Sequence, residues 1–405
     1  MTELCQALIR VPSANPPGDT APIADMIETW LGDIDGIETR RIVARAPATN
    51  LVVRLEGARP GRRLVINGHL DTFPTGDAAR WTIPPFAGEI REGRLYGRGA
   101  SDMKAGIAAA LMTLRLLAAR RSELAGELVL TLAGDEETGG AFGTQWLLQH
   151  VPEATGDAML NGDAGAPRVL RFGEKGRLWL RVMARGKATH GAHVHLGENA
   201  IDRLVAALAR FTTLHNLAAP VPTDIIAAIA EAAPISEPLS GAGEAKTLTH
   251  ITVNIGTISG GSAINIVPDQ AEALVDIRFP PGIGGEEITR WIAENLETLP
   301  GITYEILSCD EPNWTSPSHE IVTLTRRNAE ALLGDRVVAN MRVGFSDARF
   351  YRQRGIPSVV YGPTPFNMGA ANEHVLLDDL FAVFYVHAMT AYDYLTLPAA
   401  EGVPG

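Results

Sequence analysis

Strand-like and helix-like segments alternate through the first 170 residues, and this order limits the possible folds more than any other feature. Apolar residues recur at helical spacing from Ala21 to Leu31, and an Ala/Leu-rich helix is expected at residues 105–121. Short apolar or β-branched runs, typical of buried strands, lie at residues 50–55, 63–66 and 127–133. Strands that alternate with helices in this way predict an α/β sheet covered on both faces.

A second alternation occupies the middle of the chain. Strands are expected at residues 178–184, 250–258, 271–277 and 303–307, and helices at residues 199–217 and 286–299. This β-α-β-β-α-β order is typical of a ferredoxin-like unit, in which the Pro/Gly/Ala-rich stretch at residues 218–243 is expected to be a long loop. The α/β pattern then returns, with a strand expected at residues 357–361. Residues 174–312 are therefore predicted to be inserted into a domain formed by residues 1–173 and 313–405.

The charge balance narrows the classes of partner that the chain can bind. The sequence has 35 Lys and Arg residues against 47 Asp and Glu residues, a formal net charge of −12, which argues against nucleic acids and anionic membranes. No apolar run approaches the roughly 20 residues that a membrane-spanning helix needs, and the first residues do not resemble a signal peptide. The two cysteines, Cys5 and Cys309, form no CxxC pattern, so a cytoplasmic, reducing compartment is expected.

Polar clusters follow several of the apolar runs, at the strand ends where sites of α/β proteins gather. In the first cluster, Asp71 follows His69 by two residues. A carboxylate in this place can orient a metal-binding histidine, although a hydrogen-bonded structural histidine fits the same pattern. In the second cluster, glycines precede Asp102 near the start of a predicted helix, so Asp102 is either a helix cap or an exposed ligand.

Two more clusters add carboxylates. Glu136 and Glu137 lie in the acidic turn DEETGG after an apolar run, and such a group repels itself unless a cation compensates or solvent surrounds it. Asp163 lies in the stretch NGDAG, which alone fits an ordinary turn. Taken together, one histidine and several carboxylates at strand ends favour a site for zinc, manganese or cobalt, in which one carboxylate bridges two ions and another acts as a base.

The stretches GHLDTFP, YGRGASDMKAG and DEETGG resemble, in this order, those of the M20 metallopeptidase family, whose members include deacetylases, desuccinylases, aminoacylases and carboxypeptidases. The resemblance extends from about Met1 to Leu395. It implies a zinc-peptidase-like α/β catalytic domain with an inserted ferredoxin-like α+β domain for dimerisation or as a lid, and hence a homodimer. It also implies that metal-activated water hydrolyses an amide bond in a small N-acylated amino acid. The alternatives are a dipeptidase or carboxypeptidase acting on short peptides, or a non-catalytic member that lacks the second metal.

The resemblance implies which side chains bind metal. His69 matches the histidine of the first metal, Asp102 the carboxylate that bridges two ions, and Asp163 the acid that completes the first site. Glu137 matches a ligand of the second metal. The expected cofactor is one or two divalent ions, with zinc preferred and cobalt or manganese as alternatives.

Three further matches concern catalysis. Glu136 matches the general base, Asp71 the acid that orients the metal-binding histidine, and His190 a histidine that reaches into the active site of the partner subunit and helps to hold the oxyanion. Without the resemblance, His190, His193 and His195 are equally well surface residues or a weak metal-binding tract. A serine hydrolase is a poor alternative because the sequence has no GxSxG motif.

The resemblance also assigns the binding of substrate to side chains of both predicted domains. Asn265 matches an asparagine of the inserted domain that contacts the substrate, and Arg278 and Arg349 match arginines that bind the substrate carboxylate. A guanidinium group can hold a carboxylate through two parallel hydrogen bonds. As isolated residues, these arginines would more simply form surface salt bridges.

Two positions depart from the family pattern. The last metal-binding histidine of the family often lies four residues before the Glu of a pair that here is Asn372-Glu373, and this position holds Gly369, which has no side chain to bind metal. Either His374 replaces it as a ligand, or His374 is an ordinary loop residue and the second metal is weak or absent. Phe345 stands where relatives have a small polar residue, and its ring is expected to narrow the pocket or to make it more apolar.

Overall fold

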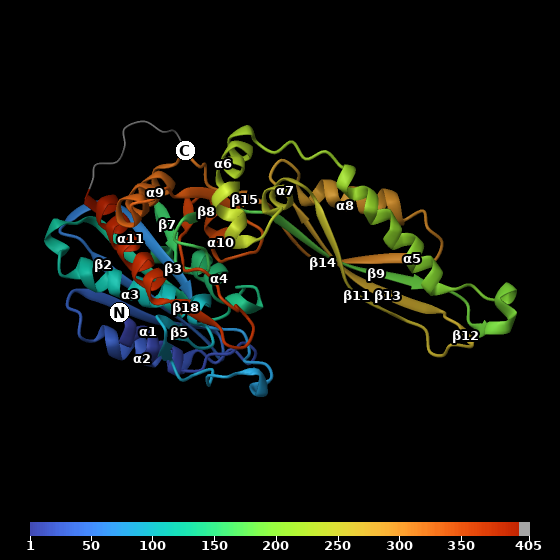
Figure 1. Ribbon diagram of the computed structural model, residues 1–405, viewed down its shortest axis with the longest axis horizontal. Helices are drawn as coiled ribbons and strands as arrows, with labels where there is room; N and C mark the ends of the chain where they lie inside the picture. Colours follow the sequence, from blue (N-terminus) through green and yellow to red (C-terminus); the bar gives the residue numbers. More distant parts are fainter. Residues whose placement is uncertain (397–405) are drawn as a thin grey trace.

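The computed structural model describes residues 1–396, which form two units, each with its own β-sheet (Figure 1). The sheet of the larger unit has nine strands in the order β1-β2-β6-β3-β7-β17-β8-β15, with β16 paired to β8. The adjacent strands β6, β3, β7 and β17 run parallel to one another, which confirms the predicted α/β class. The strands are β1 (Ile37–Arg45), β2 (Ala48–Glu56), β3 (Arg59–His69), β6 (Ala125–Ala133), β7 (Ala158–Asn161), β8 (Val169–Glu174), β15 (Asn313–Trp314), β16 (Val338–Arg342) and β17 (Ser358–Val360).

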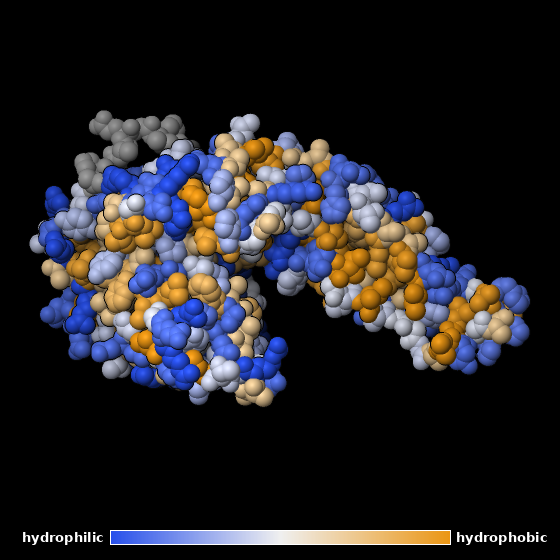
Figure 2. Space-filling model, viewed as in Figure 1, coloured by the Kyte–Doolittle hydropathy of each residue, from blue (hydrophilic) through white to orange (hydrophobic). Residues whose placement is uncertain are grey.

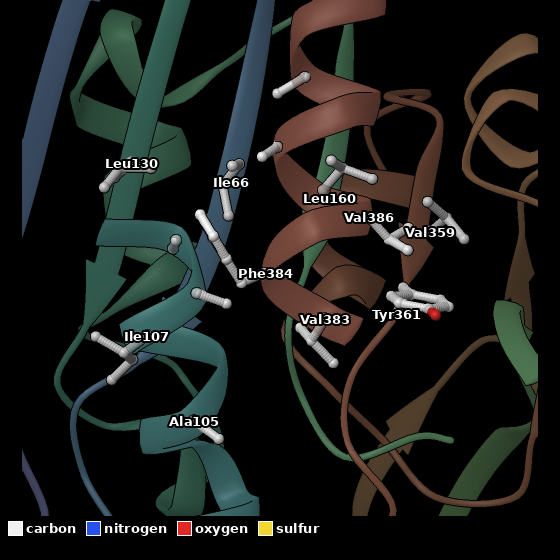
Figure 3. Close-up of a cluster of buried hydrophobic side chains, with 14 of the residues drawn as sticks. Ile66, Ala105, Ile107, Leu130, Leu160, Val359, Tyr361, Val383, Phe384 and Val386 are labelled. Carbon is white, nitrogen blue, oxygen red and sulfur yellow. The ribbon is translucent and has the colours of Figure 1, made fainter. Parts of the chain in front are cut away.

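Helices bury both faces of the larger sheet. Because successive residues of a strand point to opposite faces, Leu64 and Ile66 of β3 join one hydrophobic cluster and Val65 joins another. In the first cluster, side chains of α3 and α11 such as Ile107 and Phe384 point toward the strands (Figure 3). The helices that contribute to the first cluster include α1 (Thr2–Arg10), α2 (Ala21–Leu31), α3 (Ala105–Ala118), α9 (Glu320–Leu333) and α11 (Leu377–Thr396), and α4 (Thr144–His150) and α10 (Ala348–Arg352) contribute to the second.

The parallel strands of the larger sheet bring the predicted polar clusters to one edge. Strand β3 ends at His69, and the turn after β6 carries Glu136 and Glu137. Asp163 follows β7, which lies on the other side of β3 from β6. Because the carboxyl ends of parallel strands lie at the same edge, these side chains gather where ligands of open α/β sheets usually bind.

The smaller unit confirms the predicted ferredoxin-like arrangement. Its four antiparallel strands have the order β11-β13-β9-β14, and two helices contribute to the hydrophobic cluster on one face. A separate short pair of strands lies at the far end of this unit (Figure 1). The elements are β9 (Gly176–Arg185), α5 (Ala200–Arg210), β11 (Thr252–Gly260), β13 (Gln270–Phe279), α8 (Gly285–Leu296) and β14 (Ile302–Asp310), with β10 (Thr189–His190) and β12 (Ile266–Val267) forming the short pair.

The prediction of a long loop at residues 218–243 is wrong. Most of this stretch forms the helix α6 (Thr223–Ser240), which is followed by α7 (Glu244–Thr249). The prolines of this stretch, Pro234 and Pro238, lie inside α6, although proline usually disfavours a helix interior. Buried residues at helical spacing, including Ile225 and Ile229, pack α6 against β16 and the core of the larger unit. Tertiary packing therefore outweighs the local propensity. The division of the chain at residues 173 and 313 stays a prediction.

A small three-stranded sheet lies near the edge that carries the polar clusters. It consists of β4 (Glu89–Arg91), β5 (Arg94–Tyr96) and β18 (His374–Leu376), in the order β18-β5-β4. This sheet joins the segment before Asp102 to the C-terminal part of the chain. Among the helices within residues 1–396, none combines the length and the apolar character that are needed to cross a membrane.

A buried histidine in α11 should make the larger unit sensitive to acid. Burial lowers the pKa of His387 to about 4, and its Nε2 lies 2.8 Å from the carbonyl oxygen of Tyr361. Because the unfolded chain takes up this proton near pH 6.5, stability is lost as the pH falls from about 6.5 to about 4, by roughly 3 kcal/mol in full. We expect the free energy of unfolding of His387→Gln to depend less on pH than that of the unchanged chain. The measurement is urea denaturation between pH 7 and pH 4. His150→Gln, at an exposed histidine of α4, is the control, and equal pH dependence of the two variants would contradict the expectation.

Candidate active site

His69, Asp102 and Asp163 form the centre of the site. Nitrogen or oxygen atoms of these three side chains lie within 4.8 Å of one another, and all three residues are buried. His69 Nε2 is 3.0 Å from Asp102 Oδ1. In the part of the chain that the structure describes, this is the one such group of three potential ligands. One imidazole and two carboxylates suit zinc and related divalent ions.

The orientation of His69 depends on Asp71. His69 Nδ1 lies 2.9 Å from the main-chain oxygen of Asp71 and 3.5 Å from its carboxylate. The Asp71 carboxylate accepts hydrogen bonds from the backbone N–H groups of Glu136 and Glu137, both at 3.1 Å. Burial lowers the pKa of His69, but hydrogen bonds to Asp102 and Asp71 raise it well above its usual value. Asp71 thus ties the histidine to the acidic turn.

The two glutamates of this turn have carboxyl groups whose negative charge is poorly balanced by the residues around them. Burial raises the pKa of Glu136 to about 8, an effect that Asp347 increases and His69 opposes. Burial and then Asp102 raise the pKa of Glu137 to about 10. Glu137 Oε1 is buried without a hydrogen-bond partner among the described residues. An unpaired buried carboxylate oxygen beside three metal-type ligands fits a divalent ion, which would supply the missing positive charge.

Sequence reasoning missed Arg342, at the end of β16. Its Nη1 lies 2.8 Å from Asp163 Oδ2, and its Nη2 lies 3.4 Å from Oδ1. The Asp163 carboxylate also accepts a hydrogen bond from the backbone N–H of Ala164. Burial raises the pKa of Asp163, and Arg342 opposes this shift. Arg342 therefore gives a buried carboxylate a fixed partner.

A second missed pair holds the loop of Asp102. Glu373 accepts hydrogen bonds from Ser101 N at 3.0 Å, Ser101 Oγ at 3.1 Å and Asp102 N at 3.3 Å. Arg98 Nη1 lies 2.6 Å from Glu373 Oε2, and both side chains are 1% exposed. Arg98 Nη2 also donates to the carbonyl oxygen of Gly369. Arg98 lies in the stretch YGRGASDMKAG and Glu373 in the pair Asn372-Glu373, and only the fold brings the two side chains together.

His374 lies outside the group formed by His69, Asp102 and Asp163. Its ring stacks on Phe366 at a centroid distance of 4.9 Å and lies 4.8 Å from the ring of Tyr96. Its Nδ1 lies 3.0 Å from the main-chain oxygen of Asn372. Aromatic rings therefore surround His374, and its role as a metal ligand stays a prediction.

Gly369 adopts a backbone conformation that favours glycine. Its φ of +73° lies in the left-handed region, and a Cβ built there would lie 3.7 Å from the ring of Phe73. A histidine at this position would therefore carry backbone strain. The glycine thus suits the conformation of the loop as well as removing a ligand.

His190 and Asn265 lie far from the ligand group within one chain. His190 is exposed on β10, and its Nδ1 accepts a hydrogen bond from the backbone N–H of Ala192 at 3.1 Å. The carbonyl oxygen of Asn265 accepts from Gly191 N. Both belong to the end of the smaller unit that is remote from the larger sheet, where Figure 1 labels β12.

Arg278 and Arg349 reach a pocket of about 760 Å³ that residues of both units line. Asp102 and Glu136 line the pocket from the larger unit, and Arg278 lines it from the smaller unit. Arg349 is 3% exposed, donates to Gly139 O at 3.0 Å and lies 3.7 Å from Glu136 Oε1. The space-filling view shows a hollow between the two units (Figure 2). The pocket thus combines acidic groups with guanidinium groups, as a site for an anionic substrate beside a cation requires.

Comparisons with known proteins agree with this geometry. The sequence profile described as peptidase family M20/M25/M40 matches residues 65–393. A succinyl-diaminopimelate desuccinylase of Rhodospirillum centenum is 32% identical over 394 residues, covering 95% of this chain and 94% of the relative. A metallo-carboxypeptidase of Sulfolobus solfataricus from the M20 family superposes with a TM-score of 0.79 at 18% identity, covering 97% of this chain and 98% of that one. A dinuclear metal-binding M20 peptidase of Bacillus subtilis gives 0.68 at 16% identity, covering 97% of each chain.

Proposed function

Because this chain belongs to peptidase family M20/M25/M40 and is a hydrolase of amide bonds, we propose that it removes the acyl group from a small N-acylated amino acid. The observation that carries the proposal is a half-buried carboxylate, Glu136, beside the group His69, Asp102 and Asp163 at the wall of an arginine-lined pocket. The desuccinylase names of relatives at about 30% identity support an N-acyl amino acid as the substrate.

His69, Asp102 and Asp163 would hold a divalent ion, for which zinc is proposed and cobalt or manganese are alternatives. Glu137 would be a further ligand, and Asp102 would also contribute to a second ion if one binds. When bound, a divalent ion supplies positive charge that polarises an amide carbonyl and lowers the pKa of water. The described residues thus provide both the ligands and the unpaired oxygen that such an ion would satisfy.

The proton transfers belong to Glu136. Its carboxylate takes the proton of the attacking water and returns it to the nitrogen of the leaving amine. Asp71 keeps His69 in place and, through its hydrogen bonds to the backbone of Glu136 and Glu137, fixes the turn that presents the base. Arg349, next to Glu136, binds a carboxylate of the substrate.

The remaining assignments concern the assembly. We place the catalytic domain at residues 1–173 and 313–405 and the inserted dimerisation or lid domain at residues 174–312. In a homodimer, His190 and Asn265 of one chain would complete the site of the other, which agrees with their exposure far from their own ligand group. The proposed compartment is the cytoplasm, in keeping with free cysteines at positions 5 and 309.

Hydrolysis of a substrate panel tests the proposed function. Protein loaded with zinc, cobalt or manganese is given N-acetyl and N-succinyl amino acids and dipeptides, and the released amine is measured. We expect N-acyl amino acids to be cleaved with kcat/KM at least about tenfold above that of any dipeptide, and a chelator to abolish the activity. Preferential cleavage of dipeptides would replace the proposal by a peptidase function. Binding of metal without cleavage of any panel member would refute it.

A further inference from the structure

Two arginines of the smaller unit stand side by side on the wall of the pocket. Arg177 of β9 and Arg278 of β13 are direct partners in the antiparallel register, and both line the pocket. Like charges in directly opposite positions destabilise a pair of strands. Two guanidinium groups that are kept together therefore need nearby carboxylates or an anionic ligand to balance their positive charge.

Each guanidinium group donates hydrogen bonds to an aspartate outside the pocket. Arg177 donates to Asp310 Oδ2 through Nε at 3.0 Å and Nη2 at 2.6 Å. Arg278 donates to Asp276 through Nε at 2.7 Å and Nη2 at 3.1 Å. Neither aspartate lines the pocket, whereas both arginines do. Within residues 1–396 the Nη1 group of each arginine has no hydrogen-bond partner, so each keeps a free donor.

Aromatic rings fix the planes of these guanidinium groups. The guanidinium carbon of Arg177 lies 4.2 Å from the ring centre of Trp179 and 4.6 Å from that of Phe345. That of Arg278 lies 5.0 Å from Phe345. Stacking of this kind holds a guanidinium group in one orientation. The ring of Phe345, which lines the pocket, also lies against these two guanidinium groups.

A third guanidinium group, that of Arg349, also lies near the ring of Phe345. The guanidinium carbon of Arg349 lies 5.4 Å from the ring centre of Phe345, and its Nη1 lies 3.7 Å from Glu136 Oε1. The pocket therefore has one guanidinium group next to Glu136, that of Arg349, and two on the smaller unit, those of Arg177 and Arg278. A substrate that satisfies both positions carries two carboxylates.

We propose that Arg177 and Arg278 form a carboxylate subsite that selects substrates whose acyl group ends in a carboxylate, with Phe345 as its floor. The proposal rests on the proposed deacylase function and adds Arg177 as a specificity-determining residue. The free Nη1 donors of both arginines bind the distal carboxylate of the acyl group, while Arg349 binds the carboxylate of the amino acid. Preorganised arginines of this kind distinguish a carboxylate from a methyl group of similar size.

Kinetics on two matched substrates test the subsite. An N-succinyl amino acid is compared with the N-butanoyl derivative of the same amino acid, which has the same chain length without the carboxylate. For Arg177→Gln we expect kcat/KM to fall by about tenfold to a hundredfold with the succinyl substrate and by less than about threefold with the butanoyl substrate. Arg181→Gln is the matched control, because Arg181 lies on β9 in an ion pair with Glu305 but does not line the pocket. It should change neither value.

Binding of succinate gives a readout that does not depend on turnover. Calorimetry on the zinc-loaded protein should show a dissociation constant at least about tenfold higher for Arg177→Gln than for the unchanged chain, with butanoate binding unaltered. Arg177→Lys, which keeps the charge but not the two-pronged contact with Asp310, should give an intermediate value, and thermal midpoints check that the variants are folded. Equal losses on both substrates, or unchanged succinate binding, overturn the subsite. If the unchanged chain cleaves neither substrate, the deacylase function fails, and succinate binding still decides the subsite.

Discussion

Replacement of Glu136 by Gln should leave a folded protein that binds divalent ions but hydrolyses its substrate about 10³-fold more slowly. The amide keeps the shape of the side chain but cannot accept the proton of water, and a positioned general base contributes on the order of 10²- to 10⁴-fold to a rate. Glu136 lines the pocket and lies 3.7 Å from Arg349 Nη1, so no other part of the site needs to change. The measurements are single-turnover rates at saturating metal and, separately, metal affinity by calorimetry.

The neighbouring glutamate is the matched control. Glu137→Gln changes the same chemical group in the same turn, but its carboxylate has the unpaired buried oxygen and is proposed to bind metal. We expect this variant to bind metal more weakly and to regain activity as the metal concentration rises, whereas Glu136→Gln should stay inactive at every concentration. Activity of Glu136→Gln within threefold of the unchanged chain would rule out the assignment of the base.

His190→Ala should lower kcat by about 10²-fold, because the loss of one preorganised donor to an oxyanion costs on the order of 10²- to 10³-fold. The effect should not come from the histidine's own chain, since His190 is exposed at the end of the smaller unit remote from the ligand group. His193→Ala, in the same turn and with its ring 6.0 Å from that of His190, is the control and should be near normal. A drop of equal size in both variants would indicate a structural role for the turn.

Co-expression of two inactive variants separates action within a chain from action across a dimer. In a mixed dimer of Glu136→Gln and His190→Ala chains, one site combines an intact Glu136 with an intact His190, and the other site has neither. Random pairing makes about half of the dimers mixed, with one good site of two, so about a quarter of the normal activity should return in a symmetric dimer. No recovery above that of the separate variants would mean that His190 does not act across a dimer interface.

The positions of several strands along the chain, and their burial, could be predicted from the sequence because they depend on local periodicity. Residues such as Leu64, Val65 and Ile66 form a continuous apolar run, and a strand buried on both faces has this pattern. His69 and Asp163 could be placed at one sheet edge because each follows such a run and parallel strands end together. The cluster formed by these residues with Asp102 is therefore a consequence of topology that sequence reasoning can reach.

The contacts that fix the proposed metal ligands could not be predicted from the sequence. Asp163 and Arg342 are 179 positions apart, and Arg98 and Glu373 are 275 positions apart. Nothing in local spacing connects such residues, and a single arginine or glutamate is most often a solvated surface residue. The pairing of Arg177 with Arg278 depends on strand register, which periodicity does not specify. Helix α6 was missed for the related reason that its packing partner, β16, lies about a hundred positions further along the chain.

The bonds from Glu373 to Ser101 and Asp102 also affect when the protein becomes competent. During synthesis from the N-terminus, His69, Asp102 and Asp163 leave the ribosome well before Arg342 and Glu373. Until that last segment docks, the loop of Asp102 lacks the acceptor that fixes its backbone, and Asp163 lacks its guanidinium partner. A chain cut short before residue 342 would carry His69, Asp102, Glu137 and Asp163, and we expect it to hold an ion poorly, so hydrolytic activity should begin only after the segments of Arg342 and Glu373 have docked.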